Sequence, residues 1–176
     1  MGSIKGQLIC LDTCIVLVAI AQEKPAIANV QPIIDAAENG DCQLVLPTVV
    51  IAECLYIDNI KAQSIPKDEQ SRFFERFFDR SIFEKVPAHT LLCKKAARLA
   101  QTYTLTPFDA VVVQTAISAG CDTLVTTDGE VKKKSRNRTK KHKRLLALDG
   151  MIDGAQGKLR IKTPSDVSMQ SSLSLR

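Results

Sequence analysis

Short apolar runs that alternate with helical stretches constrain the fold of this chain more than any other feature. Runs of strand length lie at 8–11, 43–46, 82–86, 122–126 and 158–162. Helices are predicted at 14–21, 25–39, 90–100 and 107–119, and two more begin after residue 47 and at residue 66. Strands covered on both faces of a parallel sheet have this continuous apolar character. The pattern therefore predicts an α/β fold, a three-layer α/β/α sandwich around a mainly parallel sheet.

The chain has the length and composition of one domain. Its 176 residues are 45% hydrophobic and 24% charged, as in an ordinary globular protein. Neither an internal repeat nor a long linker divides them. We expect a single domain over residues 1–165, with a basic insertion at 132–144 and a Ser-rich, disordered tail at 166–176.

The sequence lacks the marks of a membrane or exported protein. No apolar run reaches the roughly 18 residues of a membrane-spanning helix, and the first residues lack the pattern of a signal peptide. The six cysteines form no C-x-x-C pair, and His89 and His142 are the only histidines, so no zinc site is indicated. We expect a cytoplasmic protein with no membrane contact and with reduced, mostly buried thiols.

The helix that begins at residue 66 carries an aromatic face. Phe73, Phe74, Phe77 and Phe78 follow the spacing i, i+1, i+4, i+5, which puts them on one side of a helix. We interpret this face as part of the core, with a dimer or partner surface as the alternative.

The charge of the chain is unevenly distributed. The net charge of +5 depends on the segment 132–144, KKKSRNRTKKHKR, which holds nine of the 24 basic residues. Without it, 15 basic residues face 19 acidic ones. Such a segment suggests a polyanionic partner such as RNA, and a solvated loop without a partner is the alternative. The residues expected to contact RNA are Lys132, Lys133, Lys134, Arg136, Arg138, Lys140, Lys141, Lys143 and Arg144.

Four acidic residues fall where the predicted fold brings strand ends and helix starts together. Asp12 follows the first strand, Asp128 follows the fourth, and Glu53 lies about two helical turns past the second. Asp109 lies in the first turn of the helix predicted at 107–119. Helices that return to a parallel sheet start at the edge where the strands end, so the four acids are expected to meet in one pocket.

Each acid also has a purely structural interpretation. Asp12 could serve only to cap its helix, and Asp109 only to interact with the helix dipole. Asp128 could be no more than a turn residue. Glu53 is harder to explain in this way, because its helical neighbours are apolar and burying an unpaired carboxylate is costly. Four convergent acids repel one another unless a divalent cation joins them. Oxygen ligands favour Mg²⁺ or Mn²⁺, which would promote attack of water on phosphorus.

At these residues the sequence resembles the PIN-domain ribonucleases, notably the toxins of bacterial and archaeal toxin-antitoxin pairs. The resemblance covers about residues 7–165 and rests on Leu11-Asp12-Thr13, Val50-Ile51-Ala52-Glu53, Pro107-Phe108-Asp109-Ala110, Val125-Thr126-Thr127-Asp128 and Arg160-Ile161-Lys162-Thr163-Pro164. Each motif alone is weak, but their order and spacing along an α/β pattern make the set fairly specific.

The resemblance implies a five-stranded parallel sheet, metal-dependent hydrolysis of RNA and, often, a homodimer. The substrate would be tRNA, rRNA or mRNA, and an antitoxin protein would be a partner. Mg²⁺ or Mn²⁺ would be held by Asp12, Glu53, Asp109 and Asp128. Hydroxyl groups that orient the acids or a water would come from Thr13 and Thr126, for which a cap or strand role is equally compatible.

Two features depart from the family pattern. Cys14 stands where many relatives have Asn, and the basic insertion lengthens the crossing between Asp128 and the last strand. The insertion could grip RNA, contribute to an oligomer, or mark a role other than that of a toxin.

Two other functions fit parts of the pattern. A non-catalytic RNA-binding or assembly protein could keep this fold, although it would not need all four acids. A phosphoryl-transfer or receiver protein also has an aspartate after its first strand. The former usually carries a second Asp two residues later, where this chain has Cys14, and receiver domains have adjacent acids that are missing here.

Overall fold

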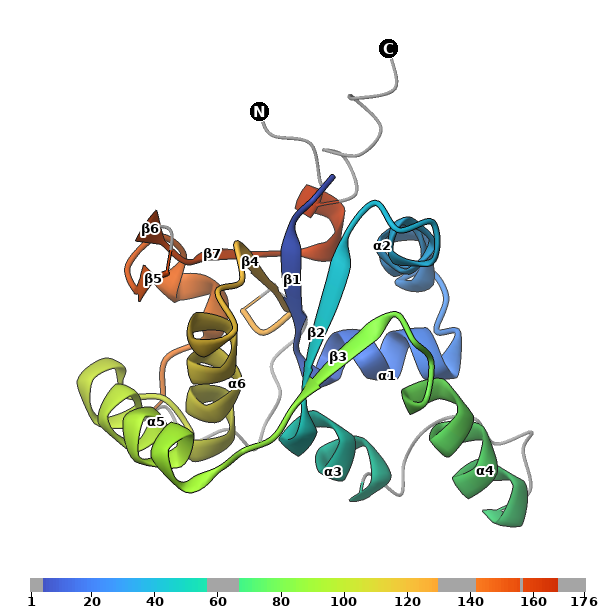
Figure 1. Ribbon diagram of the computed structural model, residues 1–176, viewed down its shortest axis with the longest axis horizontal. Coiled ribbons are helices and arrows are strands. Elements are labelled where there is room, and N and C mark those ends of the chain that lie inside the picture. Colours follow the sequence, from blue (N-terminus) through green and yellow to red (C-terminus); the bar gives the residue numbers. More distant parts are fainter. Residues whose placement is uncertain (1–4, 57–66, 130–141, 156, 168–176) are drawn as a thin grey trace.

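The computed structural model describes residues 5–56, 67–129, 142–155 and 157–167. Five strands form one sheet in the order β3-β2-β1-β4-β7 (Figure 1). They are β1 (Leu8–Leu11), β2 (Gln43–Pro47), β3 (Phe83–Val86), β4 (Thr123–Val125) and β7 (Arg160–Lys162). Every neighbouring pair is parallel, which confirms the predicted five-stranded parallel sheet.

Helices cover both faces of this sheet. They are α1 (Thr13–Ala21), α2 (Ile27–Glu38), α3 (Thr48–Tyr56), α4 (Lys67–Phe78), α5 (Thr90–Tyr103) and α6 (Pro107–Ser118). In Figure 1, α1, α2 and α4 lie on one side of the strands, and α5 and α6 lie together on the other. The expected α/β fold is therefore confirmed.

The central strands are buried on both faces, which explains their uninterrupted apolar sequence. Ile9, Leu44 and Leu124 have no exposed surface, and α6 buries Val113 and Ala116 against the sheet. Burying one of the larger aliphatic side chains contributes about 1.5 to 3 kcal/mol to the free energy of unfolding. The strands that lead to the carboxyl edge of the sheet are thus anchored in the core.

The aromatic face of α4 divides into two parts. Phe74 and Phe78 are buried, as predicted for core residues. Phe77 is half-buried and packs against Phe83, with 5.3 Å between ring centroids. Phe73 is 40% exposed, so the core interpretation is wrong for this residue.

The C-terminal part contains structure that the sequence pattern did not indicate. A 3₁₀ helix, η1 (Leu145–Leu148), precedes a small hairpin of β5 (Asp153–Gly154) and β6 (Gly157–Lys158). Leu145 and Leu148 are fully buried and hold this segment against the domain. The last sheet strand is consequently shorter than the predicted run at 158–162.

The ordered part of the chain extends beyond residue 165, where the sequence predicts that a disordered tail follows. Residues 164–167 form a helical turn, and Val167 is buried. Thr163 and Asp166 cap this turn reciprocally, because each backbone N–H donates to the other's side-chain oxygen. The tail prediction is therefore wrong for Asp166 and Val167, and residues 168–176 lie outside the described part of the chain.

The cysteines largely meet expectation. All six are free, and four of them are buried: Cys10, Cys42, Cys54 and Cys121. Cys93 is exposed, whereas Cys14 is half-buried. Among the described residues, none of the helices combines the length and apolar character that crossing a membrane requires.

Candidate active site

The carboxyl ends of β1 and β4 fix the position of Asp12, the first of the predicted acids. Asp12 follows β1 directly, and its backbone N–H donates to the carbonyl of Val125 at the end of β4. Asp12 also caps α1, because its Oδ1 accepts a hydrogen bond of 2.7 Å from the Thr13 N–H. Its side chain thus lies where the strand ends and the helix N-terminus meet.

The Asp12 carboxylate is buried and held by neutral groups. Only 8% of the residue is exposed. Its Oδ2 accepts hydrogen bonds from Thr126 Oγ1 at 2.6 Å and from Cys14 Sγ at 3.3 Å. Burial raises the pKa of Asp12, and these hydrogen bonds oppose the rise only in part. The negative charge of Asp109 raises this pKa further, so the two acids lie within electrostatic reach of each other.

Glu53 is joined to Asp12 through Thr13. Glu53 lies half-buried on α3, and the Thr13 hydroxyl donates to its Oε2 at 2.5 Å. The same residue donates its backbone N–H to Asp12. Thr13 therefore contacts both acids, Glu53 through its hydroxyl and Asp12 through its backbone N–H. A role of this hydroxyl in catalysis stays a prediction.

Asp109 occupies the first turn of α6. Thr106 caps this helix by accepting a hydrogen bond of 3.2 Å from the Asp109 N–H, and Pro107 begins it. This confirms the helix start predicted from the sequence. The helix N-terminus faces the same edge of the sheet as Asp12 and is a favourable place for a negative charge.

Asp128 is connected to the site through Thr126, but its carboxylate has partners of its own. Thr126 is fully buried, donates to Asp12, and accepts a hydrogen bond of 2.9 Å from the Asp128 N–H. The carboxylate accepts hydrogen bonds from Arg144 Nη1 at 2.7 Å and from the Leu145 N–H at 3.1 Å. A metal-ligand role for Asp128 stays a prediction.

Cys14 belongs to this network, which its sequence context did not show. Besides contacting Asp12, its Sγ accepts a hydrogen bond of 3.3 Å from the Thr127 N–H. Burial, and then the charge of Asp12, raise the pKa of this thiol to about 12. Cys14 is therefore a neutral thiol that bridges α1 and the end of β4. The sequence signals for this role are its separation of two residues from Asp12 and its place where many relatives have Asn.

The donor chemistry of the site fits a hard divalent cation. Among the described residues, no Lys or Arg pairs with Asp12 or Glu53. No three acidic, histidine or cysteine side chains in the described ranges lie close enough together to hold an ion by themselves. Mg²⁺ commonly keeps several waters and takes one or two carboxylates plus substrate oxygens, so a pair of acids is sufficient to begin such a site.

The basic insertion returns to the domain beside these acids. The Lys143 N–H donates to the Thr104 carbonyl at 2.9 Å, immediately before the start of α6, and Arg144 reaches Asp128. The other seven predicted RNA contacts lie at 132–141, outside the described residues.

Comparisons with known proteins agree with this architecture. The sequence matches the PIN domain family over residues 9–137. One similar structure is that of VapBC2 from Rickettsia felis, bound to a DNA fragment from their promoter. The matching chain has 17% sequence identity to this one and a TM-score of 0.52, and the match covers 88% of this chain and 98% of that chain. A second is PAE2754 from Pyrobaculum aerophilum, with 20% sequence identity and a TM-score of 0.56. This match covers 98% of this chain and 99% of that chain. No curated protein sequence matches the chain significantly. The chain belongs to the PIN domain family, whose members are generally nucleases that use divalent metal ions.

Proposed function

We propose that this protein is an Mg²⁺- or Mn²⁺-dependent endoribonuclease. The observation that carries the proposal is the Asp12 carboxylate, which is buried without a cationic partner among the described residues and lies near Glu53 and Asp109. An ionised carboxylate in such surroundings is costly unless a cation joins it. Asp12, Glu53 and Asp109 would hold the metal.

The side chains around the acids would keep them oriented. Bound metal would supply Lewis acidity to a phosphate oxygen and promote attack of water. Thr126 and Cys14 fix the Asp12 carboxylate, and Thr13 fixes both Asp12 and Glu53. The N-terminus of α6 would add a favourable field for the phosphate.

Arg144 links the fourth acid to the substrate in this proposal. The Arg144 side chain is 46% exposed and uses one N–H on Asp128, so further donors of the guanidinium are available to a phosphate. Arrival of RNA would draw Arg144 toward the phosphate, and Asp128 Oδ1 would exchange this hydrogen bond for a contact to the metal. The basic insertion would supply further salt-dependent affinity for RNA.

The biological setting of the proposed activity is that of a toxin. The fold resembles that of VapBC2 from Rickettsia felis, which is bound to a DNA fragment from their promoter in its crystal structure. By analogy we propose an antitoxin partner, a homodimer and a cytoplasmic location for this single-domain chain. RNA of the tRNA, rRNA or mRNA class would be the substrate.

The direct test is cleavage of total cellular RNA. The purified protein is expected to produce new, mappable ends with Mn²⁺ and none in excess chelator. Asp109→Asn should abolish these ends while leaving the fold intact, because the carboxylate is half-buried at a helix start that Thr106 and Pro107 still define. Unchanged RNA binding without any Mn²⁺ binding would instead favour the non-catalytic module.

Arg144→Ala is expected to change metal and RNA binding in opposite directions. It removes a phosphate contact, so RNA affinity should fall and the slope of log affinity against log salt should decrease by about 0.7 to 1. It also removes the positive charge that pairs with Asp128, so Mn²⁺ should bind more tightly. Arg98→Ala on α5 is the matched control, since Arg98 is exposed and lies outside the site. Unchanged binding of both ligands to Arg144→Ala would refute the proposed transfer of Arg144 from Asp128 to RNA.

A further inference from the structure

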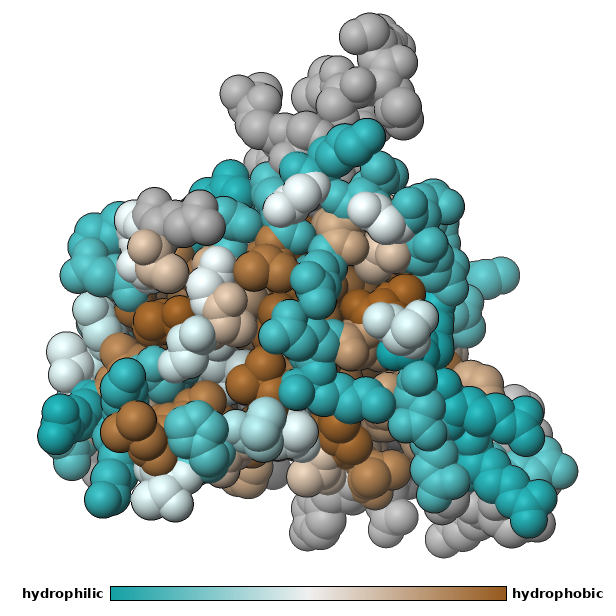
Figure 2. All heavy atoms as spheres, in the orientation of Figure 1, coloured by the Kyte–Doolittle hydropathy of each residue, from teal (hydrophilic) through white to brown (hydrophobic). Residues whose placement is uncertain are grey.

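Helix α4 presents an aromatic ring to solvent beside a hollow that the proposed catalytic site does not include. Phe73 is 40% exposed, although Phe74 and Phe78 on the same helix are buried. Figure 2 shows hydrophilic side chains over α4 at the lower right of this face. A ring exposed in this way is available to stack against a ligand.

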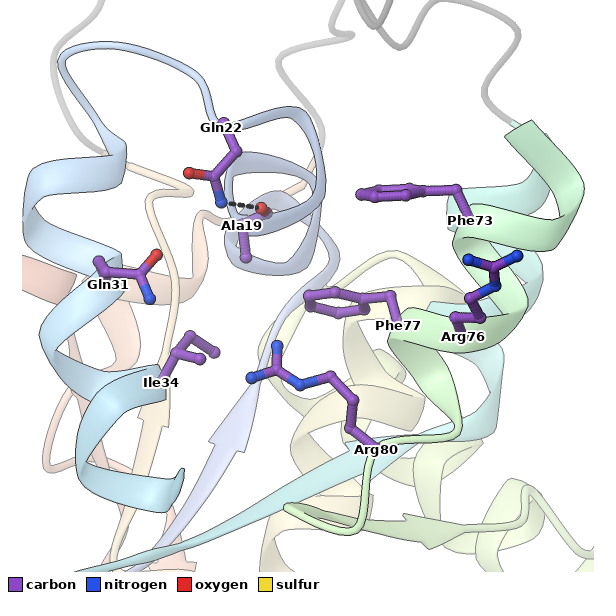
Figure 3. A pocket seen from close by; sticks show the side chains of 8 residues that line it. All are labelled: Ala19, Gln22, Gln31, Ile34, Phe73, Arg76, Phe77 and Arg80. Carbon is purple, nitrogen blue, oxygen red and sulfur yellow. Dashed lines mark hydrogen bonds between the residues drawn. The ribbon is translucent and has the colours of Figure 1, made fainter. Parts of the chain in front are cut away.

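The hollow lies between α4 and the helices α1 and α2 and has a volume of about 360 Å³. Figure 3 shows Phe73 and Phe77 projecting from α4 toward α1 and α2, which contribute Ala19 and Ile34 to the lining. Its lining is mainly apolar, with flat rings on one side. Such a hollow has the size and surface for one aromatic ring system rather than for a folded element.

Arginines surround the same ring. Arg76 lines the hollow, and Phe73 and Arg76 also line a second hollow of about 400 Å³ together with Arg72 and Glu69. Arg80 lies with its guanidinium carbon 5.5 Å from the centroid of the Phe77 ring and forms an ion pair with Glu38. Glu38 therefore partly neutralises the positive charge of Arg80. Among the described residues, no acidic side chain lines the first hollow. The surface thus offers an apolar stacking platform next to two guanidinium groups.

Two glutamine amides complete the hollow. Gln22 donates to the Ala19 carbonyl at 2.8 Å, and Gln31 donates to Asp35 at 2.8 Å. Each amide keeps its oxygen and one further N–H as hydrogen-bonding groups. Amide groups of this kind suit the donor and acceptor edge of an unpaired base.

The first hollow and the acidic site lie at opposite ends of one helix. Asp12 caps the start of α1, and Ala19 lies near its end, which separates them by about 10 Å along the helix at 1.5 Å per residue. A short single strand held at the acids can reach the hollow. Stacking on an aromatic ring together with cationic contacts to the backbone is the usual way in which proteins bind single-stranded nucleic acid.

We propose that this hollow is a nucleobase subsite, in which an unpaired base of the RNA stacks on Phe73 while Arg72 and Arg76 bind adjacent phosphates. The proposal rests on the proposed function, because it specifies which part of the RNA substrate the protein binds at a distance from the cleaved bond. It predicts a preference for single-stranded over fully paired RNA.

The chain contains no tryptophan, so Phe73→Trp introduces a single fluorophore at the proposed stack. In an Asp109→Asn background, short single-stranded oligoadenylate RNA should quench its fluorescence, and the same strand in a duplex should not. Leu91→Trp on α5 is the matched control, because Leu91 is exposed and lies on the other side of the sheet. Phe73→Ala should weaken binding of the single strand by roughly 5- to 100-fold.

The charge contacts are tested separately. Arg76→Ala should reduce the salt dependence of oligoadenylate binding, whereas Arg98→Ala should not. Absence of quenching at Phe73→Trp with intact binding would overturn the base subsite. Quenching by a short acidic peptide that contains phenylalanine, but not by RNA, would assign the hollow to a protein partner and would also overturn it. Because these measurements use equilibrium binding, a failure of cleavage alone would refute the proposed function and leave the subsite standing.

Discussion

Replacement of Asp12 by Asn is expected to stabilise the metal-free protein and to abolish RNA cleavage. The two effects have one cause, the burial of a carboxylate that holds the metal in the proposed function. Asparagine has the same shape and caps a helix about as well as aspartate, so the start of α1 should persist. Removing the buried charge relieves its desolvation, and we expect a gain on the order of 1 kcal/mol in the free energy of unfolding.

The sign of the pH dependence follows from the raised pKa of Asp12. The ordinary value for this carboxyl is 3.8, and the folded protein holds a higher one. Between those two values the folded state binds more protons than the unfolded state, so stability falls as the pH rises. The stabilising contribution of protonated Asp12 is complete below pH 3.8 and is lost as the pH rises through the folded pKa. Asp12→Asn should lack this component of the pH profile.

Denaturant unfolding at several pH values in chelator measures the stability effect, and cleavage of total RNA with Mn²⁺ measures the activity. Cleavage should fall by more than roughly a hundredfold, since even outer partners of metal ligands cost 10- to 100-fold when changed. Asp153→Asn is the control, because Asp153 is exposed and pairs with Lys158 on the hairpin. An Asp12→Asn protein that is less stable than wild type in chelator would show that the carboxylate is structural.

The sequence predicts those parts of the site that depend on regular structure. Asp12 and Asp109 are placed by a strand end and by a capped helix start, and both signals are local. Because parallel strands end at one edge of the sheet, the α/β pattern alone brings these acids together. The metal-ligand set itself stays a prediction.

Contacts that depend on irregular backbone could not be predicted in the same way. Arg144 reaches Asp128 because η1 is held by the buried side chains of Leu145 and Leu148, and a 3₁₀ segment of this length has no usable periodicity. Cys14 was expected to be a buried thiol, since nothing in its neighbours indicates the backbone N–H of Thr127 as a partner.

The exposure of Phe73 was missed for a different reason. The aromatic spacing on α4 shows which residues share a helix face, but it does not show how much of that face the neighbouring helices cover. Coverage depends on the positions of α1 and α2, which sequence periodicity does not specify. Phe74 and Phe78 are covered, and Phe73 lies at the margin.

Mn²⁺ is expected to stabilise the wild-type protein strongly and to lose this effect when Asp12 is replaced. A ligand that binds only the folded state adds about 2.7 kcal/mol at a free concentration one hundred times its Kd. For a chain of this size that gain corresponds to a rise in Tm of roughly 5 to 11 °C. The rise should diminish on acidification, because the protonated form of Asp12 competes with the metal and burial already favours that form.

Thermal unfolding with and without Mn²⁺ tests this linkage independently of any substrate. Asp12→Asn and Asp109→Asn should each show little or no rise in Tm, whereas Asp153→Asn should show the wild-type rise. Equal rises in wild type and Asp12→Asn would place the bound Mn²⁺ elsewhere on the chain. The combination expected here, a variant more stable than wild type in chelator and less stable than it in Mn²⁺, has no explanation in helix capping alone. It follows only if the cost of burying Asp12 is offset when a cation binds.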